Sequence, residues 1–282
     1  MRPKVDPHFR CVTFADSFHI MYHDDEIDDR SSITGQLMEL SREIGQAKND
    51  WVAVAEGNVS ARIHGADMLV KVTGARLASA NEDDFVRVRT SELVTILDSN
   101  ASSDMDVRMA LKASVIDKEK RVPSVESLLH AVCLSTGGAR FAAHTHPTAV
   151  NSFLCSDQSG ALVYGSLFPD QIVVMGRHQL LVPYADPGLQ LARTVRTEIL
   201  RFVERHQALP RVIYLESHGM FALGRSAREV LDITEMTTKT ARVLLGSMSV
   251  GRPRYLTPSD ADRIDTRPDE ISRRHVLGYS AR

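Results

Sequence analysis

The stretch Ala142-Ala143-His144-Thr145-His146-Pro147 decides the interpretation of this chain, because two histidines lie one residue apart at the end of an apolar run. Successive side chains of a β-strand point to opposite faces, so His144 and His146 would share a face. A third histidine, His218, lies in Glu216-Ser217-His218-Gly219, directly after a second apolar run. Three imidazoles with an open fourth position are the ligand set of a catalytic zinc site. The sequence therefore predicts a metal centre.

Glu126 is the candidate acid/base group for this centre. It lies in Pro123-Ser124-Val125-Glu126, where a helix is expected to begin because Pro and Ser favour helix N-termini. An acidic residue there could also be an ordinary solvated side chain stabilised by the helix dipole. The helix leads directly into the strand with the histidine pair, and this position favours the catalytic role. His130 shares the helix face of Glu126; it either orients the glutamate or packs in the core.

Two glycine turns are candidates for holding an anion. Glu56-Gly57-Asn58-Val59-Ser60 and Val72-Thr73-Gly74-Ala75 each place glycine and small polar residues beside an apolar strand. Backbone N–H groups and hydroxyls at such turns can bind phosphate. The alternative is a tight turn that needs glycine only for its backbone dihedral angles.

The order of these motifs resembles the class II aldolase/adducin family. Gly-Asn-x-Ser, Thr-Gly, Pro-Ser-x-Glu-(x)₃-His, His-Thr-His-Pro and His-Gly follow one another between Ile33 and Leu245. Fuculose-phosphate aldolase, rhamnulose-phosphate aldolase and ribulose-phosphate 4-epimerase belong to this family, and residues 123–131 and 182–188 look most like the rhamnulose-phosphate branch. The resemblance implies a single-domain α/β/α sandwich with a central, mainly antiparallel sheet. It also implies a homotetramer with sites at subunit interfaces.

The resemblance assigns roles to individual positions. It implies that zinc is bound by His144, His146 and His218 and that Glu126 is the acid/base catalyst. It also implies that substrate phosphate is bound by four small residues, namely Asn58, Thr73, Gly74 and Ser124. Tyr164 falls near a tyrosine that crosses into the neighbouring subunit's site in some family aldolases, although a strand tyrosine usually packs. Val125 stands where many relatives carry a second hydroxyl.

The predicted function is that of a lyase, a class II metal-dependent aldehyde-lyase. It would reversibly cleave a ketose 1-phosphate, or a similar sugar-acid phosphate, to an enediolate fragment such as dihydroxyacetone phosphate and an aldehyde. The cofactor would be Zn²⁺ or another divalent cation such as Mn²⁺. The same ligands also suit decarboxylation of a 3-oxo acid or its phosphate, and sugar-phosphate 4-epimerisation. A non-enzymatic adducin-like interaction module is the alternative from another class.

Composition agrees with a globular enzyme, and the resemblance implies a small-molecule sugar phosphate as its partner. The net charge of −2 gives no electrostatic reason to expect nucleic acid or an acidic membrane as partner. No apolar stretch approaches the length of a membrane span. The three cysteines form an odd set without metal-like spacing, which favours reduced thiols and a cytoplasmic location.

The chain divides into an N-terminal extension, residues 1–30, and one aldolase-like domain, residues 31–282. Apolar residues at helical spacing predict helices over residues 33–44 and 89–97, and after residues 186 and 226. Strands are expected over the short apolar runs, namely residues 51–55, 68–72, 162–164, 171–175, 180–184 and 212–215.

Overall fold

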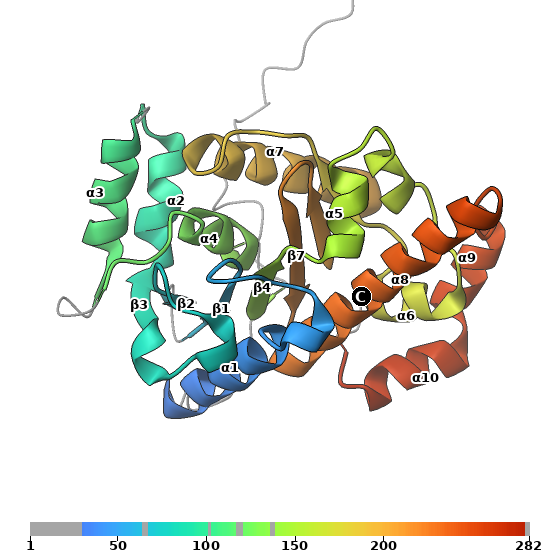
Figure 1. Cartoon of the computed structure of the whole chain (residues 1–282), viewed down its shortest axis with the longest axis horizontal. Helices are drawn as coiled ribbons and strands as arrows, with labels where there is room; N and C mark the ends of the chain where they lie inside the picture. The colour runs from blue at the N-terminus through green and yellow to red at the C-terminus, as the bar shows by residue number, and fades with distance from the viewer. Residues whose placement is uncertain (1–29, 64–66, 101–102, 117–120, 136–138, 280–282) are drawn as a thin grey trace, which may run out of the picture.

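The computed structural model describes residues 30–63, 67–100, 103–116, 121–135 and 139–279. The predicted extension, residues 1–30, lies outside this part except for its last residue. A seven-stranded sheet runs through the middle and helices cover both of its faces, as Figure 1 shows. This arrangement confirms the predicted α/β/α architecture.

The sheet has the strand order β3-β2-β1-β4-β7-β6-β5, so β4 lies at its centre. Five neighbouring pairs are antiparallel, and β5 pairs with β6 in parallel. The sheet is thus mainly antiparallel, as predicted. The strands are β1 Asn58–Arg62, β2 Asp67–Lys71, β3 Phe85–Arg89, β4 Phe141–Thr145, β5 Leu180–Val182, β6 Val212–Leu215 and β7 Gly219–Gly224.

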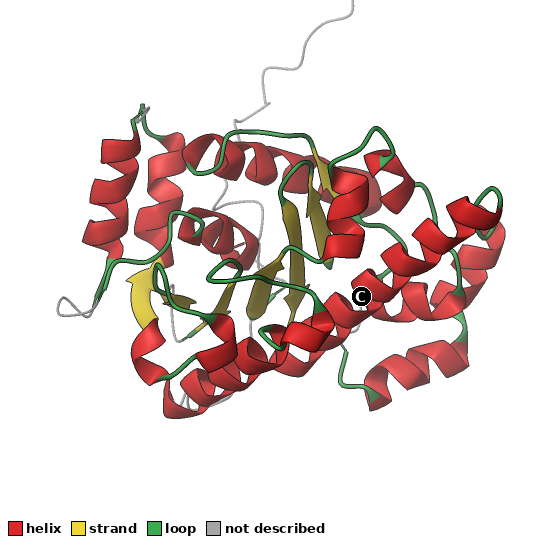
Figure 2. Ribbon diagram, in the orientation of Figure 1, coloured by secondary structure: helices red, strands yellow, loops and turns green. Residues whose placement is uncertain are grey.

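Two groups of helices form the outer layers (Figure 2). One face of the sheet is covered by α2 Thr90–Asp98, α3 Asp104–Ser114, α4 Ser127–Ser135 and α7 Leu189–His206. The other face carries α1 Arg30–Ile44, α5 Thr148–Leu154, α6 Pro169–Met175 and α8 Ala227–Val250. The last two helices, α9 Pro258–Thr266 and α10 Pro268–Val276, pack against α6. Among the helices of the described residues, none has the length and apolar character needed to cross a membrane.

Side-chain alternation along the strands separates two hydrophobic cores. In β4, Ala142 joins the core under α4 and α7, whereas Phe141 and Ala143 join the core under α1 and α8. Neighbouring strands alternate in the same way, because the pleat turns successive side chains to opposite faces. His144 is in phase with Ala142, so its side chain lies on the face covered by α4. This register determines which helix can bring a catalytic group to the histidines.

Three predicted strands are wrong. Residues 171–175 form most of α6, which begins with Pro169 and is followed by Gly176 with φ of 83°. This short run is buried on all sides, so it lacks the periodicity that separates helix from strand. Residues 51–55 form a loop, because Asp50 and Val54 have positive φ. Leu162 ends a short 3₁₀ helix, Ser159–Leu162, and residues 163 and 164 form a turn after it.

Candidate metal centre

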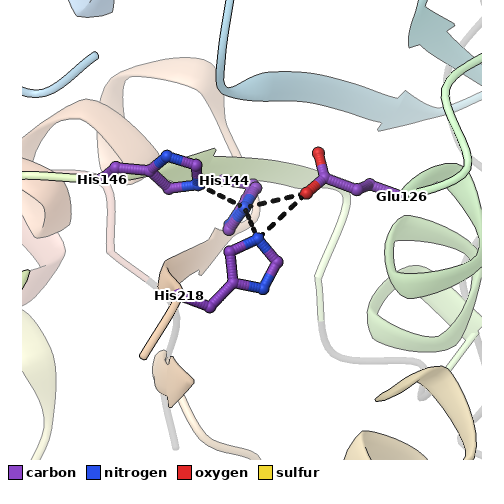
Figure 3. Close-up of side chains that lie close together, drawn as sticks. All are labelled: Glu126, His144, His146 and His218. Carbon is purple, nitrogen blue, oxygen red and sulfur yellow. Dashed lines mark hydrogen bonds and ion pairs between the residues drawn. The ribbon is translucent and has the colours of Figure 1, made fainter. Parts of the chain in front are cut away.

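Three histidines reach one point from two neighbouring segments of the sheet (Figure 3). His144 is in β4, where its Cα pairs with Asn58 of β1 and Phe221 of β7. His146 follows two residues later, just beyond the end of the strand. His218 lies in the turn between β6 and β7, in which Ser217 has φ of 53°. The antiparallel pairing of β4 with β7 brings this turn to the end of β4.

The ring nitrogens of these histidines and one carboxylate oxygen form a compact cluster. The Nε2 atom of His144 lies 2.9 Å from that of His146 and 3.3 Å from that of His218. Glu126 places its Oε1 atom 3.1 Å from His218 Nε2 and 3.4 Å from His144 Nε2. Each of these four residues offers one potential metal-ligand atom, and the four atoms all lie within 4.8 Å of one another.

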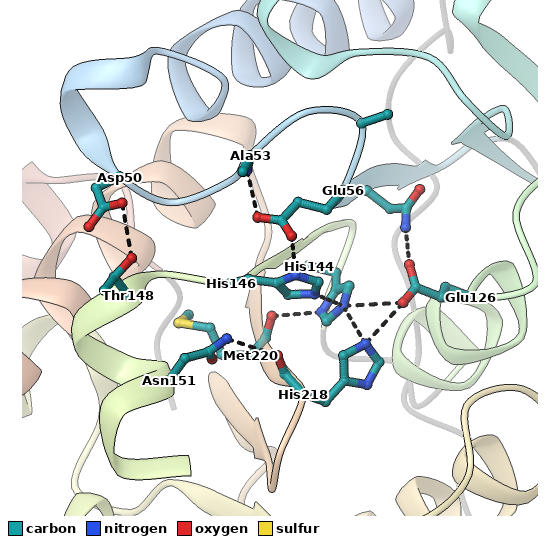
Figure 4. Close-up of polar contacts among 12 residues, drawn as sticks. Asp50, Ala53, Glu56, Glu126, His144, His146, Thr148, Asn151, His218 and Met220 are labelled. Atoms are coloured by element: carbon teal, nitrogen blue, oxygen red, sulfur yellow. Dashed lines mark hydrogen bonds and ion pairs between the residues drawn. The ribbon is translucent and has the colours of Figure 1, made fainter. Parts of the chain in front are cut away.

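Hydrogen bonds on the far side of two rings determine where their lone pairs point. His144 Nδ1 faces the carbonyl oxygen of Met220 at 3.0 Å, and His146 Nδ1 faces Glu56 Oε2 at 3.0 Å (Figure 4). Neither acceptor can donate a proton, so both Nδ1 atoms carry hydrogen. In the neutral imidazoles the Nε2 lone pairs are therefore directed into the cluster.

The donor set fits a divalent cation. Two Nε2 lone pairs that face each other at 2.9 Å repel in the absence of a shared positive charge. Tetrahedral zinc with Zn–N distances of about 2.0–2.1 Å separates its ligands by roughly 3.3 Å. The nearest ligand contacts in the cluster span 2.9–3.4 Å. The chemistry and the spacing both suit an ion bound by three histidines and a carboxylate.

Glu126 is held as a carboxylate with two different environments. Its Oε1 atom faces the histidines, and its Oε2 atom accepts a hydrogen bond from the Asn58 amide. Burial is the largest influence on the pKa of Glu126 and raises it, but His144 and His218 together lower that pKa well below the usual range. Helix α4 begins at Ser127, so Glu126 lies in the turn before it rather than in its first turn. The backbone N–H of Glu126 donates to Ser124 Oγ at 3.3 Å.

The structure brings the predicted phosphate-binding segments together beside Glu126. Val72 and Pro123 form an antiparallel bridge, and Thr73 N donates to Val122 O at 3.4 Å. Thr73 and Gly74 are exposed at the end of β2, Gly74 with φ of 80°. The anion-binding role of this group stays a prediction.

A buried lysine connects the two glycine turns. Lys71 is 2% exposed, and its Nζ donates to Ala75 O at 2.7 Å and to Ala55 O at 3.4 Å. Burial lowers its pKa, while the carboxylate of Glu126 acts in the opposite direction. The ammonium group therefore holds the turn after β2 against the turn before β1.

Tyr164 lies apart from the described contacts of the cluster. It is 79% exposed, in the turn after the 3₁₀ helix Ser159–Leu162, and its ring lies 4.9 Å from that of Tyr255. An exposed tyrosine remains available to a second subunit, so the expectation for Tyr164 stays a prediction.

The histidines are supported from behind by Phe221, which no motif predicted, and by His130, for which core packing was one of the two expectations. Phe221 stacks on His144 with ring centroids 4.6 Å apart, and the edge of His130 packs against Phe221 at 5.0 Å. His130 Nδ1 pairs with Ser60 Oγ at 2.6 Å, and its Nε2 has no hydrogen-bond partner among the described residues. The ring therefore packs beneath the site and does not orient the Glu126 carboxylate through a hydrogen bond. Only the strand register places Phe221 opposite His144, and no local motif reveals it.

Comparison with known proteins agrees with this site and fold. The family model described as the Class II Aldolase and Adducin N-terminal domain matches residues 35–245. The chain therefore belongs to the class II aldolase/adducin family. Its members' fold is the one described above, and the four potential ligands all lie within the matched region.

Individual relatives are more distant. An L-fuculose 1-phosphate aldolase structure is 17% identical with a TM-score of 0.64, and the match covers 84% of this chain and 96% of that one. YgbL from Klebsiella pneumoniae, provisionally assigned to the aldolases, epimerases or decarboxylases, is 18% identical with a TM-score of 0.63, covering 83% and 98%. The uncharacterised oxidoreductase YuxG of Bacillus subtilis is 25% identical over 163 residues, 57% of this chain. The matched part is only 21% of that relative's length.

Gly219→Ala is expected to disrupt the cluster. A Cβ atom at Gly219 would lie 2.4 Å from His146 Cδ2 and 2.6 Å from the backbone oxygen of Thr145, so the ring must move. We expect metal affinity to fall by about tenfold or more, measured by competition with a chromogenic chelator. Gly246→Ala is the control, because nothing lies within 4 Å of its Cβ. Equal affinity in the two variants would contradict the close fit at Gly219.

His130 predicts a pH dependence of stability. Burial, followed by the charge of His144, lowers the pKa of His130 from its ordinary value of 6.5 to about 3. Below pH 6.5, His130 therefore binds a proton in the unfolded chain but not in the folded one. The free energy of unfolding consequently falls as the pH drops towards 3. The slope from one such group is at most about 1.4 kcal/mol per pH unit.

His130→Gln removes this titration and keeps an acceptor for Ser60 Oγ. Urea unfolding of the metal-free protein between pH 4 and pH 8 should give a shallower pH dependence in the variant than in the wild type. Parallel curves for the two proteins would show that His130 is protonated without cost in the folded state.

Proposed function

We propose that this protein is a metal-dependent aldolase, a lyase that reversibly cleaves a ketose 1-phosphate or a similar sugar-acid phosphate. The products would be an enediolate fragment such as dihydroxyacetone phosphate and an aldehyde. The observation that carries this proposal is the convergence of three histidine Nε2 atoms with the carboxylate of Glu126. One oxygen of this carboxylate faces the histidines, and the other accepts a hydrogen bond from Asn58. Membership of a family of sugar-phosphate enzymes supports the same conclusion.

His144, His146 and His218 would hold the cation, with Glu126 completing the ligand set at rest. Zn²⁺, or another divalent cation such as Mn²⁺, supplies a Lewis acid that stabilises negative charge developing on substrate oxygen. Phe221 and the Nδ1 hydrogen bonds keep the rings of His144 and His146 in position, so these two ligands need little reorganisation when substrate binds.

Glu126 would move the proton at the substrate carbon that becomes nucleophilic. It is the carboxylate of the cluster, it is largely buried, and its anionic form is favoured by the neighbouring histidines. Asn58 would keep the carboxylate within reach of the reacting carbon by holding Oε2. A positioned base of this kind contributes about 10²–10⁴ in rate.

The phosphate group would bind where the turn after β2 meets the segment before α4. Thr73, Gly74 and Ser124 would offer hydroxyl and backbone N–H groups there, and the remaining amide hydrogen of Asn58 would contribute. Val125 is exposed at this edge and offers no donor, so phosphate would bind with fewer hydrogen bonds than in relatives with a second hydroxyl.

Decarboxylation of a 3-oxo acid and 4-epimerisation use the same ligands and are the second candidate function. YgbL is provisionally assigned to the aldolases, epimerases or decarboxylases, so the activity assays should include decarboxylation and epimerisation as well as aldol cleavage. We also propose a cytoplasmic homotetramer in which Tyr164, exposed on this chain, serves the site of a neighbouring subunit. The intact four-residue cluster argues for an enzyme over a silent interaction module.

Glu126→Gln separates the base from the metal site. The substitution keeps the shape and the acceptor oxygen but removes proton transfer, so turnover should fall by roughly 10²–10⁴ while most of the metal remains. His146→Ala is the comparison, because loss of one imidazole leaves the metal shell incomplete. Elemental analysis should find about one divalent ion per wild-type chain and much less in His146→Ala. Near-normal turnover of Glu126→Gln would move the base to another residue.

Proton exchange identifies the reaction. With wild-type enzyme in deuterated water, dihydroxyacetone phosphate should exchange one hydroxymethyl proton without any aldehyde, because exchange needs only the metal centre and its base. Nuclear magnetic resonance follows the loss of that proton signal, and Glu126→Gln should abolish it. Absence of exchange, combined with CO₂ release from a 3-oxo acid substrate, would decide for the decarboxylase.

A further inference from the structure

Glu56 is a second carboxylate at the metal centre, behind His146. Its Oε2 atom lies 3.0 Å from His146 Nδ1, on the side of the ring opposite the cluster. Its Oε1 atom accepts from the backbone N–H of Ala53 at 2.5 Å. The Glu56 side chain is 36% exposed, so this carboxylate keeps part of its hydration while it supports the histidine.

A tight turn delivers Glu56 to this position. Glu56 N donates to Ala53 O at 3.0 Å, so main chain and side chain of Glu56 close the turn together. Val54, at the tip, has φ of 51° although it is β-branched, and this conformation is costly for such a residue. The turn therefore persists only because its contacts, including the one to His146, hold it.

The same loop is fastened to the histidine segment at two further points. His146 N donates to Trp51 O at 2.8 Å, and Thr148 Oγ1 donates to Asp50 Oδ1 at 3.0 Å. Backbone and side chain of His146 are thus both held by the loop of residues 50–56. Figure 4 shows the side-chain contacts of this loop, from Glu56 to His146 and from Thr148 to Asp50. The position of Glu56 relative to the His146 ring is therefore fixed both by its own contact with the ring and by the attachment of its loop to the histidine segment.

Only a carboxylate satisfies both contacts of Glu56. Ala53 N–H and His146 Nδ1–H are both donors, so the side chain between them must supply two acceptors. An amide supplies one acceptor and one donor, and would place N–H against N–H at one of the two contacts. The negative charge also makes His146 a better electron donor through its opposite nitrogen.

The three histidines differ in their partners behind the ring. His146 faces an anionic carboxylate, whereas His144 faces the neutral carbonyl of Met220. The Nδ1 atom of His218 is buried and has no hydrogen-bond partner among the described residues. Of the three ligands, His146 is the one whose ring is fixed by a charge-assisted hydrogen bond, which is stronger than a neutral one.

We propose that Glu56 is a positioning residue of the metal centre, which fixes the tautomer and ring orientation of His146 through a carboxylate–histidine pair. The inference rests on the metal centre of the proposed function and does not depend on which reaction the centre performs. Glu56 acts through His146 and does not touch the reacting atoms.

The test measures metal binding by the full chain, with Zn²⁺ alone as the ligand. Glu56→Ala should weaken Zn²⁺ affinity by about 10- to 100-fold in competition with a chromogenic chelator. Glu56→Gln, which keeps one acceptor, should fall between Glu56→Ala and wild type. Asp50→Asn is the matched control, since it removes one carboxylate charge from the same loop but keeps an Oδ1 acceptor for Thr148 and does not touch His146. It should bind Zn²⁺ within about twofold of wild type.

A spectroscopic measurement separates positioning from loop stability. In Co²⁺-substituted protein, the visible absorption bands report the ligand field at the metal, so Glu56→Ala should shift them and Asp50→Asn should not. Zn²⁺ affinity of Glu56→Ala within about twofold of wild type, or unchanged Co²⁺ bands, would overturn the inference. If Glu56→Ala fails to fold, wild-type affinity in Glu56→Gln would overturn it equally.

The outcome is independent of the reaction assay. Wild-type protein that binds Zn²⁺ but neither exchanges dihydroxyacetone phosphate protons nor cleaves sugar phosphates would refute the aldolase proposal and leave the role of Glu56 intact. Aldolase activity with unimpaired Zn²⁺ binding in Glu56→Ala would refute the role of Glu56 alone.

Discussion

The pairing of the central strand β4 with β1 on one side and β7 on the other is the constraint on which the site depends. It places Asn58 and Phe221 on either side of His144 and turns all three side chains towards α4. A slip of one residue would move every side chain of β4 to the opposite face. His144 would then lie under α1 and α8, away from Glu126. The two hydrophobic cores fix the register, because Phe141 and Ala143 fill one core and Ala142 the other.

The sequence was sufficient for the residues that carry a local signature. The His-x-His pair and His218 follow apolar runs, and both runs form strands of the sheet, β4 and β6. The order of the motifs indicated the family, and with it a mainly antiparallel sheet between helices. The amphipathic spacing of Ile33, Leu37, Leu40 and Ile44 predicted α1, and these four residues supply the buried apolar side chains of that helix. Each of these features has a signal within one short segment, either helical spacing of apolar residues or a histidine motif at the end of an apolar run.

The rest depends on contacts between segments that are distant in sequence. Residues 171–175 are buried on all sides, and their apolar run is equally compatible with helix and strand. Asn58 was predicted from its motif, but its contact with Glu126 joins residues 68 positions apart. Glu56 directly precedes the Gly57-Asn58 turn, yet its pairing with His146 follows from the tertiary fold alone. Propensity and periodicity describe a segment and its neighbours, and they carry no information on such pairings.

The spread of the potential ligands along the chain links metal binding to folding. His144 and His218 are 74 residues apart, and Glu126 and His218 are 92 apart, yet their side chains meet at one point. In the unfolded chain, bringing these segments together costs loop-closure entropy that grows with their separation. A cation held by all four groups therefore binds the native state far better than the unfolded one. Such a cation would act as a reversible cross-link, and the free energy of unfolding would then depend on the free metal concentration.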